Sequence, residues 1–264
     1  MKILVTVKEV AEVEDEFEIS GLDIDESYLE YDLNEWDDYA VEEAVQYSEE
    51  NDDVEVVTVT IGPERSEETI RMALAKGADR AIRVWDDSLE GVDFLSTEAT
   101  SEMLAAVAEE EDPDIVFSGV QSDDDANGAT GVMLANKLDM EWAAVVNTLD
   151  LDLDEGVAGV HRELERGIEE LTDVRTPAVL TIQSGINEPR YASLRGIRQA
   201  QQKPLDVQSL DDLGLDTGSL DSPLERTSMY EPESEGDATI WEGSPEDTAG
   251  ELADFLRDKG VVEG

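Results

Sequence analysis

Short apolar runs alternate with helical patterns through the first half of the chain, and this alternation constrains the fold more than any other feature. Runs typical of buried strands cover residues 2–7, 54–61, 80–84 and 115–118. Helical spacing covers residues 39–49, 97–109 and 131–138, and a further helix follows Ser66, which can cap it, and stops at Gly77. Strands that alternate with helices pair in parallel, so the sequence predicts a doubly wound, mostly parallel α/β sheet.

The pattern changes after Trp142. Residues 145–151, 157–164 and 168–174 are separated by Asp, Glu and Gly turns and are typical of antiparallel strands, and another strand covers 178–182. We therefore expect an antiparallel addition to the sheet. From Leu205 the chain becomes loop-like, and one amphipathic helix follows Ser244 and Pro245. The sequence thus predicts an α/β domain of residues 1–204 and an arm of residues 205–264, whose helix packs on the domain or on another chain.

The charge of the chain bears on its environment and partners. The 264 residues include 68 Asp and Glu against 18 Lys and Arg, a formal net charge of −50. Three interpretations are open: disorder, which the well-formed apolar runs oppose; a surface for basic partners; and adaptation to molar salt, where repulsion is screened. We favour the last, a halophile's protein, because the acids are spread along the whole chain. Nucleic acid is disfavoured as a partner because its phosphates would be repelled.

The remaining composition narrows the chemistry. The chain has no cysteine and one histidine, His161, which excludes disulfides, iron–sulfur clusters and sites with several imidazoles. His161 lies in a strand pattern and is expected to be structural, and no motif of a catalytic nucleophile is present. Met1 and Lys2 lead directly into a strand, and no apolar run approaches about 20 residues. We therefore expect a cytoplasmic protein in a high-salt cytosol.

The loop of residues 119–131, GVQSDDDANGATG, is the most informative segment of the first half. It follows a strand and precedes a helix, which places backbone amides and a helix N-terminus where a phosphate binds. It matches neither the dinucleotide fingerprint nor a P-loop. The alternative is a flexible acidic turn. Three consecutive acids, Asp123, Asp124 and Asp125, lack the spacing of a calcium loop, so no metal site is predicted.

The segment of residues 186–204 is locally basic in a strongly acidic chain. It carries Arg190, Arg195, Arg198 and Lys203 against one acid, Glu188. Leu194 lies between small and basic residues, and an exposed leucine there can anchor a partner protein with an acidic rim. The alternative is that Leu194 belongs to the core and the arginines pair with local acids.

Together these segments resemble the beta subunit of the electron-transfer flavoproteins. The resemblance rests on KILVTVKEV, LNEWDDYAVEEAVQ, VTIGPERSEETIRMALAKGADRAIRV, and above all on HRELERG followed by PAVLTIQSGINEPRYASLRGIRQAQQKP. It covers nearly the whole chain, and the long NEPRY…L…I…A…KP pattern has fixed spacing.

The resemblance implies that this chain binds AMP in its α/β domain, while an alpha subunit holds most of an FAD. The implied AMP contacts are Thr6, Asn34, Glu35, Trp36, Asp37, Ile61, Gly119, Gln121 and Asp124, with the backbone of Gly128, Ala129 and Thr130 around the phosphate. The loop departs from the family's pattern at Asp123, where relatives usually carry an aliphatic residue, and at Ala129, where many carry Gln.

The resemblance also implies partners and a function. Leu194, beside Arg190, Tyr191 and Arg195, falls at a leucine that anchors the family into acyl-CoA dehydrogenases, and Glu163 at a carboxylate that faces the mobile FAD domain. The C-terminal helix matches an arm that wraps the alpha subunit. The implied function is electron transfer, from dehydrogenases through FAD to a membrane flavoprotein-quinone oxidoreductase, with no catalytic residue in this chain.

Two alternatives stay open. Bifurcating relatives hold a second FAD in place of AMP and oxidise NADH. A protein of another class, a non-redox module that senses adenine nucleotides, would be a stable monomer without a flavoprotein partner.

Overall fold

A computed structural model describes residues 1–90, 92, 95–152, 155–220, 224–231 and 239–262. These residues belong to two compact units, Met1–Met229 and Tyr230–Gly264, each of which is described by itself. Within the described ranges, no helix is both long enough and apolar enough to cross a membrane.

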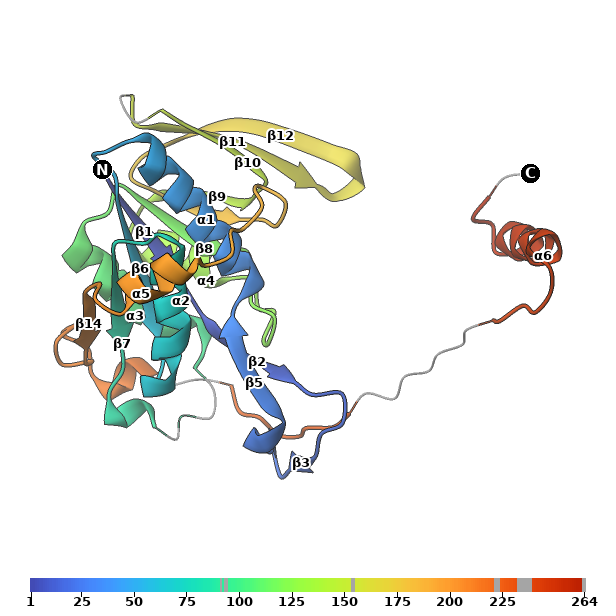
Figure 1. Ribbon diagram of the computed structural model, residues 1–264, viewed down its shortest axis with the longest axis horizontal. Helices are drawn as coiled ribbons and strands as arrows, with labels where there is room; N and C mark the ends of the chain where they lie inside the picture. The colour runs from blue at the N-terminus through green and yellow to red at the C-terminus, as the bar shows by residue number, and fades with distance from the viewer. Residues whose placement is uncertain (91, 93–94, 153–154, 221–223, 232–238, 263–264) are drawn as a thin grey trace. The chain divides into compact units, whose positions relative to one another are not determined.

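The first unit is built around a seven-stranded sheet in which all neighbouring strands are parallel (Figure 1). The strand order is β14-β7-β6-β1-β8-β13-β9. The strands are β1 (Lys2–Thr6), β6 (Glu55–Ile61), β7 (Arg80–Val84), β8 (Ile115–Gly119), β9 (Glu141–Val146), β13 (Ala178–Ile182) and β14 (Leu205–Gln208). The predicted α/β fold with a mostly parallel sheet is therefore confirmed.

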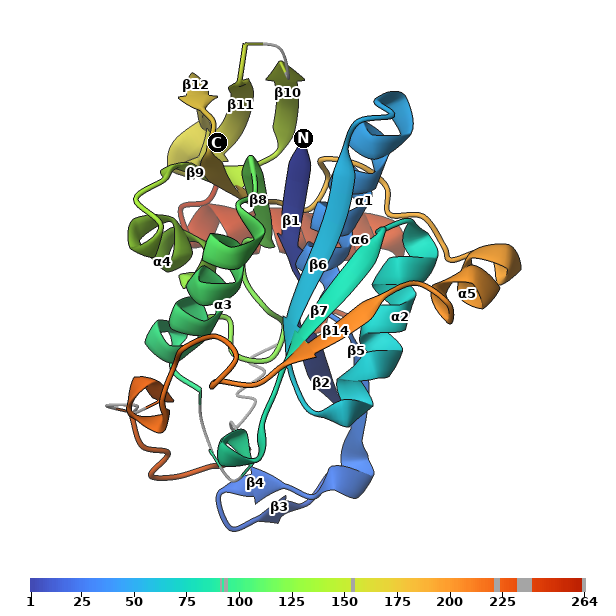
Figure 2. The ribbon, with the colours of Figure 1, turned by 90° about the vertical axis from the view of Figure 1, so that its left-hand side faces the viewer.

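Helices cover both faces of this sheet (Figure 2). On one face lie α1 (Glu35–Glu50) and α2 (Glu67–Lys76), with α5 (Leu194–Ala200) packed against α2, and on the other lie α3 (Thr97–Glu111) and α4 (Thr130–Lys137). Successive side chains of a strand point to opposite faces, so Ile3 and Val5 of β1 enter the first core and Leu4 the second. A strand that is covered on both faces needs such a continuous apolar run.

The antiparallel strands form a separate three-stranded sheet of β10 (Thr148–Asp152), β11 (Val157–Leu164) and β12 (Ile168–Arg175). The single strand predicted over residues 145–151 is wrong. Residues up to Val146 belong to β9, which pairs in parallel with β13. A bulge interrupts β9 before its last residue, where Val145 has φ 63 and donates its N–H to the Thr181 hydroxyl, 2.9 Å away. The chain leaves the main sheet after Val146, and β10 begins at Thr148.

Two small antiparallel pairs were not predicted. They are β2 (Glu9–Val13) with β5 (Leu29–Leu33), and β3 (Ile19–Ser20) with β4 (Asp23–Ile24). The prediction of a loop from Leu205 onward is also wrong at its start, because β14 pairs with β7 at the edge of the main sheet. The short helical turns are η1 (Glu26–Tyr28), η2 (Glu64–Ser66), η3 (Asp87–Leu89), η4 (Glu165–Gly167) and η5 (Thr217–Leu220).

The start of one helix and the cap of another differ from the sequence prediction. Helix α1 begins at Glu35, ahead of the predicted Tyr39, so the acidic residues before Tyr39 occupy its first turn, where the helix dipole favours them. Ser66 precedes α2 but its hydroxyl does not cap the helix; it donates to Glu9 Oε1 at 3.1 Å. Gly77 ends α2 as predicted.

The second unit contains α6 (Pro245–Asp258). Ser244 caps this helix by accepting the N–H of Asp247, and Pro245 stands at its first position, as predicted. Trp241 packs edge-on against Phe255, with ring centroids 5.4 Å apart. The helix buries no described residue, and Leu252 and Phe255 are 44% and 37% exposed, so its apolar side is available to another surface.

Candidate functional site

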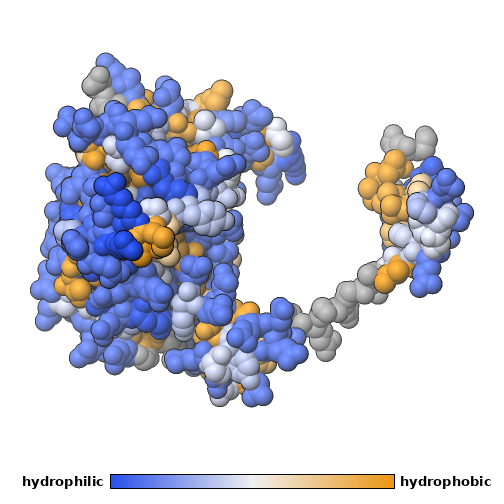
Figure 3. Space-filling view, viewed as in Figure 1, coloured by the Kyte–Doolittle hydropathy of each residue, from blue (hydrophilic) through white to orange (hydrophobic). Residues whose placement is uncertain are grey.

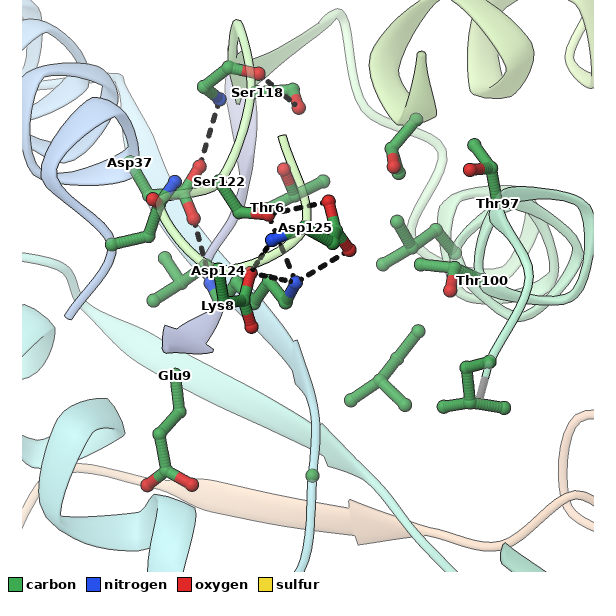
Figure 4. A pocket seen from close by; sticks show the side chains of 18 of the residues that line it. Thr6, Lys8, Glu9, Asp37, Thr97, Thr100, Ser118, Ser122, Asp124 and Asp125 are labelled. Atoms are coloured by element: carbon green, nitrogen blue, oxygen red, sulfur yellow. Dashed lines mark hydrogen bonds and ion pairs between the residues drawn. The ribbon is translucent and has the colours of Figure 1, made fainter. Parts of the chain in front are cut away.

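A cavity of about 540 Å³ opens at the carboxyl ends of β1, β6 and β8 (Figure 4). Strand β1 lies between the other two, and the chain leaves it first toward β6 and later toward β8. This is the switch point of a doubly wound sheet, where ligands of such folds bind. The volume falls within the range of small-molecule sites.

Most residues implied by the family resemblance meet in this cavity. Those that line it are Thr6, Asn34, Asp37, Ile61, Gly119, Gln121, Asp124, Gly128, Ala129 and Thr130. Glu35 and Trp36 do not line it. The Trp36 indole donates to Gln183 Oε1 at 3.0 Å, and the Glu35 N–H points to Asp123 Oδ2 at 3.3 Å.

Asp37 holds the cavity walls together. Its buried carboxylate accepts the backbone N–H of Lys8 at 2.8 Å and that of Gly119 at 2.9 Å. Burial raises the pKa of Asp37 to about 7, although these hydrogen bonds oppose the shift. A side chain at position 119 would collide with Asp37 and Trp36, so the close approach of the two segments requires glycine there.

The loop between β8 and α4 is fixed at one end by Asn34. The Asn34 amide donates to the Gln121 carbonyl at 2.9 Å and accepts the Asp123 N–H at 3.2 Å. This end of the loop is therefore tied to the residue that precedes α1. Among the described residues, no group of three or more acids or histidines is placed to bind a metal ion.

The other end of the loop delivers an uncapped helix N-terminus to the cavity. Ala129 precedes α4 and carries no acceptor, so no side chain caps the first turn. Gly128 adopts φ 60, a conformation that glycine tolerates, and leads the chain into the helix. The free N–H groups and the helix dipole make this end of the cavity suited to an anion.

Lys8 is a site residue that the sequence did not reveal. Its ammonium donates to Ser122 Oγ at 3.0 Å, Asp124 Oδ1 at 2.6 Å and Asp125 Oδ2 at 2.9 Å (Figure 4). Burial alone lowers the pKa of Lys8, but the bonds to the two carboxylates outweigh it, and the pKa lies above its ordinary value. The one available signal was the position of Lys8, directly after the first strand in a chain with few cations.

The opposite wall of the cavity was also missed. It is formed by the start of α3 and the residues before it, and includes Val92, Leu95, Thr97, Thr100 and Leu104. Figure 4 shows Thr97 and Thr100 across the cavity from Lys8 and the loop acids. The cavity thus has one charged wall and one largely apolar wall.

The predicted partner segment presents an exposed leucine. Leu194 is 79% exposed and Tyr191 is 98% exposed, so the alternative that Leu194 belongs to the core is wrong. Figure 3 shows hydrophobic atoms beside the most hydrophilic ones over α5. Among the ion pairs of the described residues, none involves Arg195 or Arg198, whose charges stand beside Leu194 on this helix.

Arg190, in contrast, is turned toward its own domain. Its guanidinium bonds to both carboxylate oxygens of Glu42, at 2.8 and 3.0 Å, and to those of Glu49, at 2.6 and 2.9 Å. Burial raises the pKa of Glu42, but the bonds from Arg190 outweigh it and leave that pKa below its ordinary value. For this arginine the alternative of pairing with local acids is correct, and its charge holds the segment on α1.

The helix that carries Leu194 is fixed from behind. Arg71 of α2 donates to the carbonyls of Ala200 and Lys203, and the Lys203 ammonium donates to the carbonyls of Leu74, Gly77 and Ala78. Each helix C-terminus is therefore satisfied by a cation from the other segment. Leu194 is exposed on a well-fixed support.

Glu163 lies on β11 opposite Glu169 of β12 and is exposed. His161, on the same strand, places Nε2 3.4 Å from a Glu169 carboxylate oxygen. Neither residue reaches the cavity lining.

Comparison with known proteins agrees with this architecture. Residues 21–213 match the electron transfer flavoprotein domain. The chain is 47% identical to the electron transfer flavoprotein subunit beta of Methylophilus methylotrophus, with 98% of each chain covered. It is 31% identical to the Bacillus subtilis protein of the same description, over 99% of this chain and 100% of the other. It is also 31% identical to subunit CarD of the caffeyl-CoA reductase-Etf complex of Acetobacterium woodii, over 87% of each. The chain therefore belongs to the family of electron transfer flavoprotein beta subunits.

Proposed function

We propose that this chain binds AMP in the described cavity and pairs with an alpha subunit that holds most of an FAD. Members of the family carry electrons, and this chain is a carrier subunit rather than an enzyme. The FAD supplies the redox chemistry when bound, and the work of this chain is to hold the nucleotide and recognise partners.

The observation that carries the AMP assignment is the uncapped N-terminus of α4 at the switch point of the sheet. A phosphate is the natural partner of such free N–H groups. The apolar wall of Val92, Leu95 and Leu104 suits a purine, which needs little hydrogen bonding over its faces. The residues present therefore fit a mononucleotide.

The test is a count of bound nucleotides. The chain is co-expressed with its alpha subunit, the complex is denatured, and the released flavin and AMP are quantified. We expect one FAD and one AMP for each heterodimer. Two flavins and no AMP would contradict the proposal.

A bifurcating subunit, with a second FAD in place of AMP and oxidation of NADH, is the second candidate. The observation that favours it is the similarity to the subunit of the caffeyl-CoA reductase-Etf complex. The same count separates the two, and NADH-dependent flavin reduction is expected for this candidate alone.

The electron donors proposed are acyl-CoA dehydrogenases, and the acceptor is a membrane flavoprotein-quinone oxidoreductase. The exposure of Leu194 beside Arg195 and Arg198 supports a docking role, because an apolar anchor inside a charged rim is typical of transient recognition. Tyr191 would add contact area. Glu163 is proposed to face the FAD domain of the alpha subunit.

The second unit, Tyr230–Gly264, is proposed to pack on the alpha subunit through α6, whose apolar side chains Leu252 and Phe255 are exposed. We also propose that the complex works in a high-salt cytosol, which the net charge of −50 supports.

A further inference from the structure

The cavity places carboxylates close to the position proposed for a phosphate. Asp124 and Asp125 lie in the loop that leads to the uncapped N-terminus of α4, and both line the cavity. A phosphate dianion bound there would be repelled by these carboxylates unless a cation compensated them. The identity of that cation decides whether the site can accept a charged ligand.

Among the described residues that line the cavity, the cations are Lys8, Arg65 and Arg226. Arg65 pairs with Glu9 and lies over the ring of Tyr31, and Arg226 pairs with Asp23. Both arginines are therefore engaged by acids outside the loop. Lys8 alone of these three contacts the loop, through Ser122, Asp124 and Asp125 (Figure 4).

We propose that Lys8 determines the specificity of the cavity for a phosphorylated nucleoside, because its ammonium neutralises Asp124 and Asp125 and fixes the loop that presents the α4 N–H groups. This inference rests on the proposed AMP site. The backbone N–H of Lys8 is held by Asp37, so the side chain starts from a fixed position. A neutral residue there leaves two partly buried carboxylates facing the phosphate.

The test compares AMP with adenosine, which share the base and the ribose but differ in the phosphate. The heterodimer is freed of nucleotide and titrated with each ligand by calorimetry, at a salt concentration that keeps it folded. In Lys8→Met we expect AMP affinity to fall by roughly tenfold or more, because the charges of Asp124 and Asp125 near the phosphate are no longer compensated, while adenosine affinity changes by less than about twofold. Lys8→Arg keeps the charge and is expected to retain most of the preference for AMP.

Lys137→Met is the matched control. Lys137 also pairs with two carboxylates, Glu98 at 2.6 Å and Glu102 at 2.5 Å, but it does not line the cavity. We expect it to leave both affinities unchanged. Adding Asp124→Asn to Lys8→Met removes one of the uncompensated charges and should restore part of the AMP affinity.

The outcomes distinguish this inference from the function on which it rests. The wild-type complex could bind AMP while Lys8→Met lowers the affinities for AMP and adenosine by the same factor, or lowers neither affinity. In that case the proposed role of Lys8 is wrong while the AMP site stands. If the wild-type complex holds two flavins and binds no AMP, both are wrong. A selective loss of AMP affinity that Asp124→Asn partly reverses supports the inference.

Discussion

The Asp37 carboxylate accepts the backbone N–H of Gly119 at 2.9 Å and thereby ties the start of α1 to the end of β8. Its second oxygen accepts the N–H of Lys8, just beyond β1. One buried side chain thus joins three segments that are far apart in the sequence and that all line the cavity.

The first prediction concerns the pH dependence of stability. Because burial raises the pKa of Asp37 to about 7, the folded chain keeps a proton that the unfolded chain has lost above about pH 4. The contribution of Asp37 to the free energy of unfolding is therefore present at low pH and lost as the pH rises toward 7. Asp37→Asn cannot titrate, so wild-type stability minus variant stability should decrease from about pH 4 through pH 7 and level off above.

Guanidinium unfolding of both proteins at a series of pH values and constant high salt measures this difference. Subtracting the variant's free energy of unfolding at each pH removes the contribution of the other acids, which titrate in both proteins. A difference that is independent of pH would contradict the shifted pKa of Asp37.

The second prediction concerns Leu194. Replacing it with Ala removes the exposed apolar anchor, so electron acceptance from acyl-CoA dehydrogenases should slow, mainly through a higher KM for the carrier, with bound nucleotide unchanged. Leu22→Ala is the control, because Leu22 is also exposed, at 41%, and lies in the turn between β3 and β4, outside α5 and outside the sheet that carries Glu163. Stopped-flow or steady-state reduction of the complex by several dehydrogenases tests this. Equal kinetics for wild type and Leu194→Ala would refute the anchor role.

The third prediction concerns the fork between Arg190 and α1. Lysine cannot reach both Glu42 and Glu49 with paired hydrogen bonds, so Arg190→Lys should lower the free energy of unfolding by roughly 1–3 kcal/mol. Arg175→Lys is the comparison, since the pair of Arg175 with Glu141 is well exposed, and a clearly smaller loss is expected there. Denaturant midpoints measure both variants. Similar small losses at the two sites would show that the Arg190 fork contributes little.

Much of the fold follows from local sequence patterns. The strands around the cavity are continuous apolar runs, and such runs can be recognised in the sequence whatever they pack against. The patterns failed where geometry overrides propensity. Nothing in residues 141–152 marks the positive φ of Val145 or the end of β9 at Val146. Residues 205–208, Leu-Asp-Val-Gln, form a strand because β7 offers a free edge.

The site was harder to predict from the sequence than the fold, because its contacts join residues that are distant in the sequence. The bonds from Lys8 to Asp124 and Asp125 span 116 and 117 positions, and those from Arg190 to Glu42 span 148. A single sequence shows no sign of either pairing. The loop that we propose faces a phosphate was predictable because strand, loop and helix are contiguous, whereas the α3 wall opposite it comes from another part of the chain.

The last prediction concerns salt. At about 1 M salt the Debye length is roughly 3 Å, and at about 0.1 M it is roughly 10 Å, so dilution lets neighbouring carboxylates repel each other across the surface. With a net charge of −50, we expect the complex to unfold on dilution and to refold when KCl is restored, as followed by circular dichroism. Sucrose is excluded from the protein surface but does not screen charge, so it should stabilise the complex less than KCl does at the same osmolality. Full stability in dilute buffer would contradict adaptation to high salt and leave a surface for basic partners as the explanation of the acids.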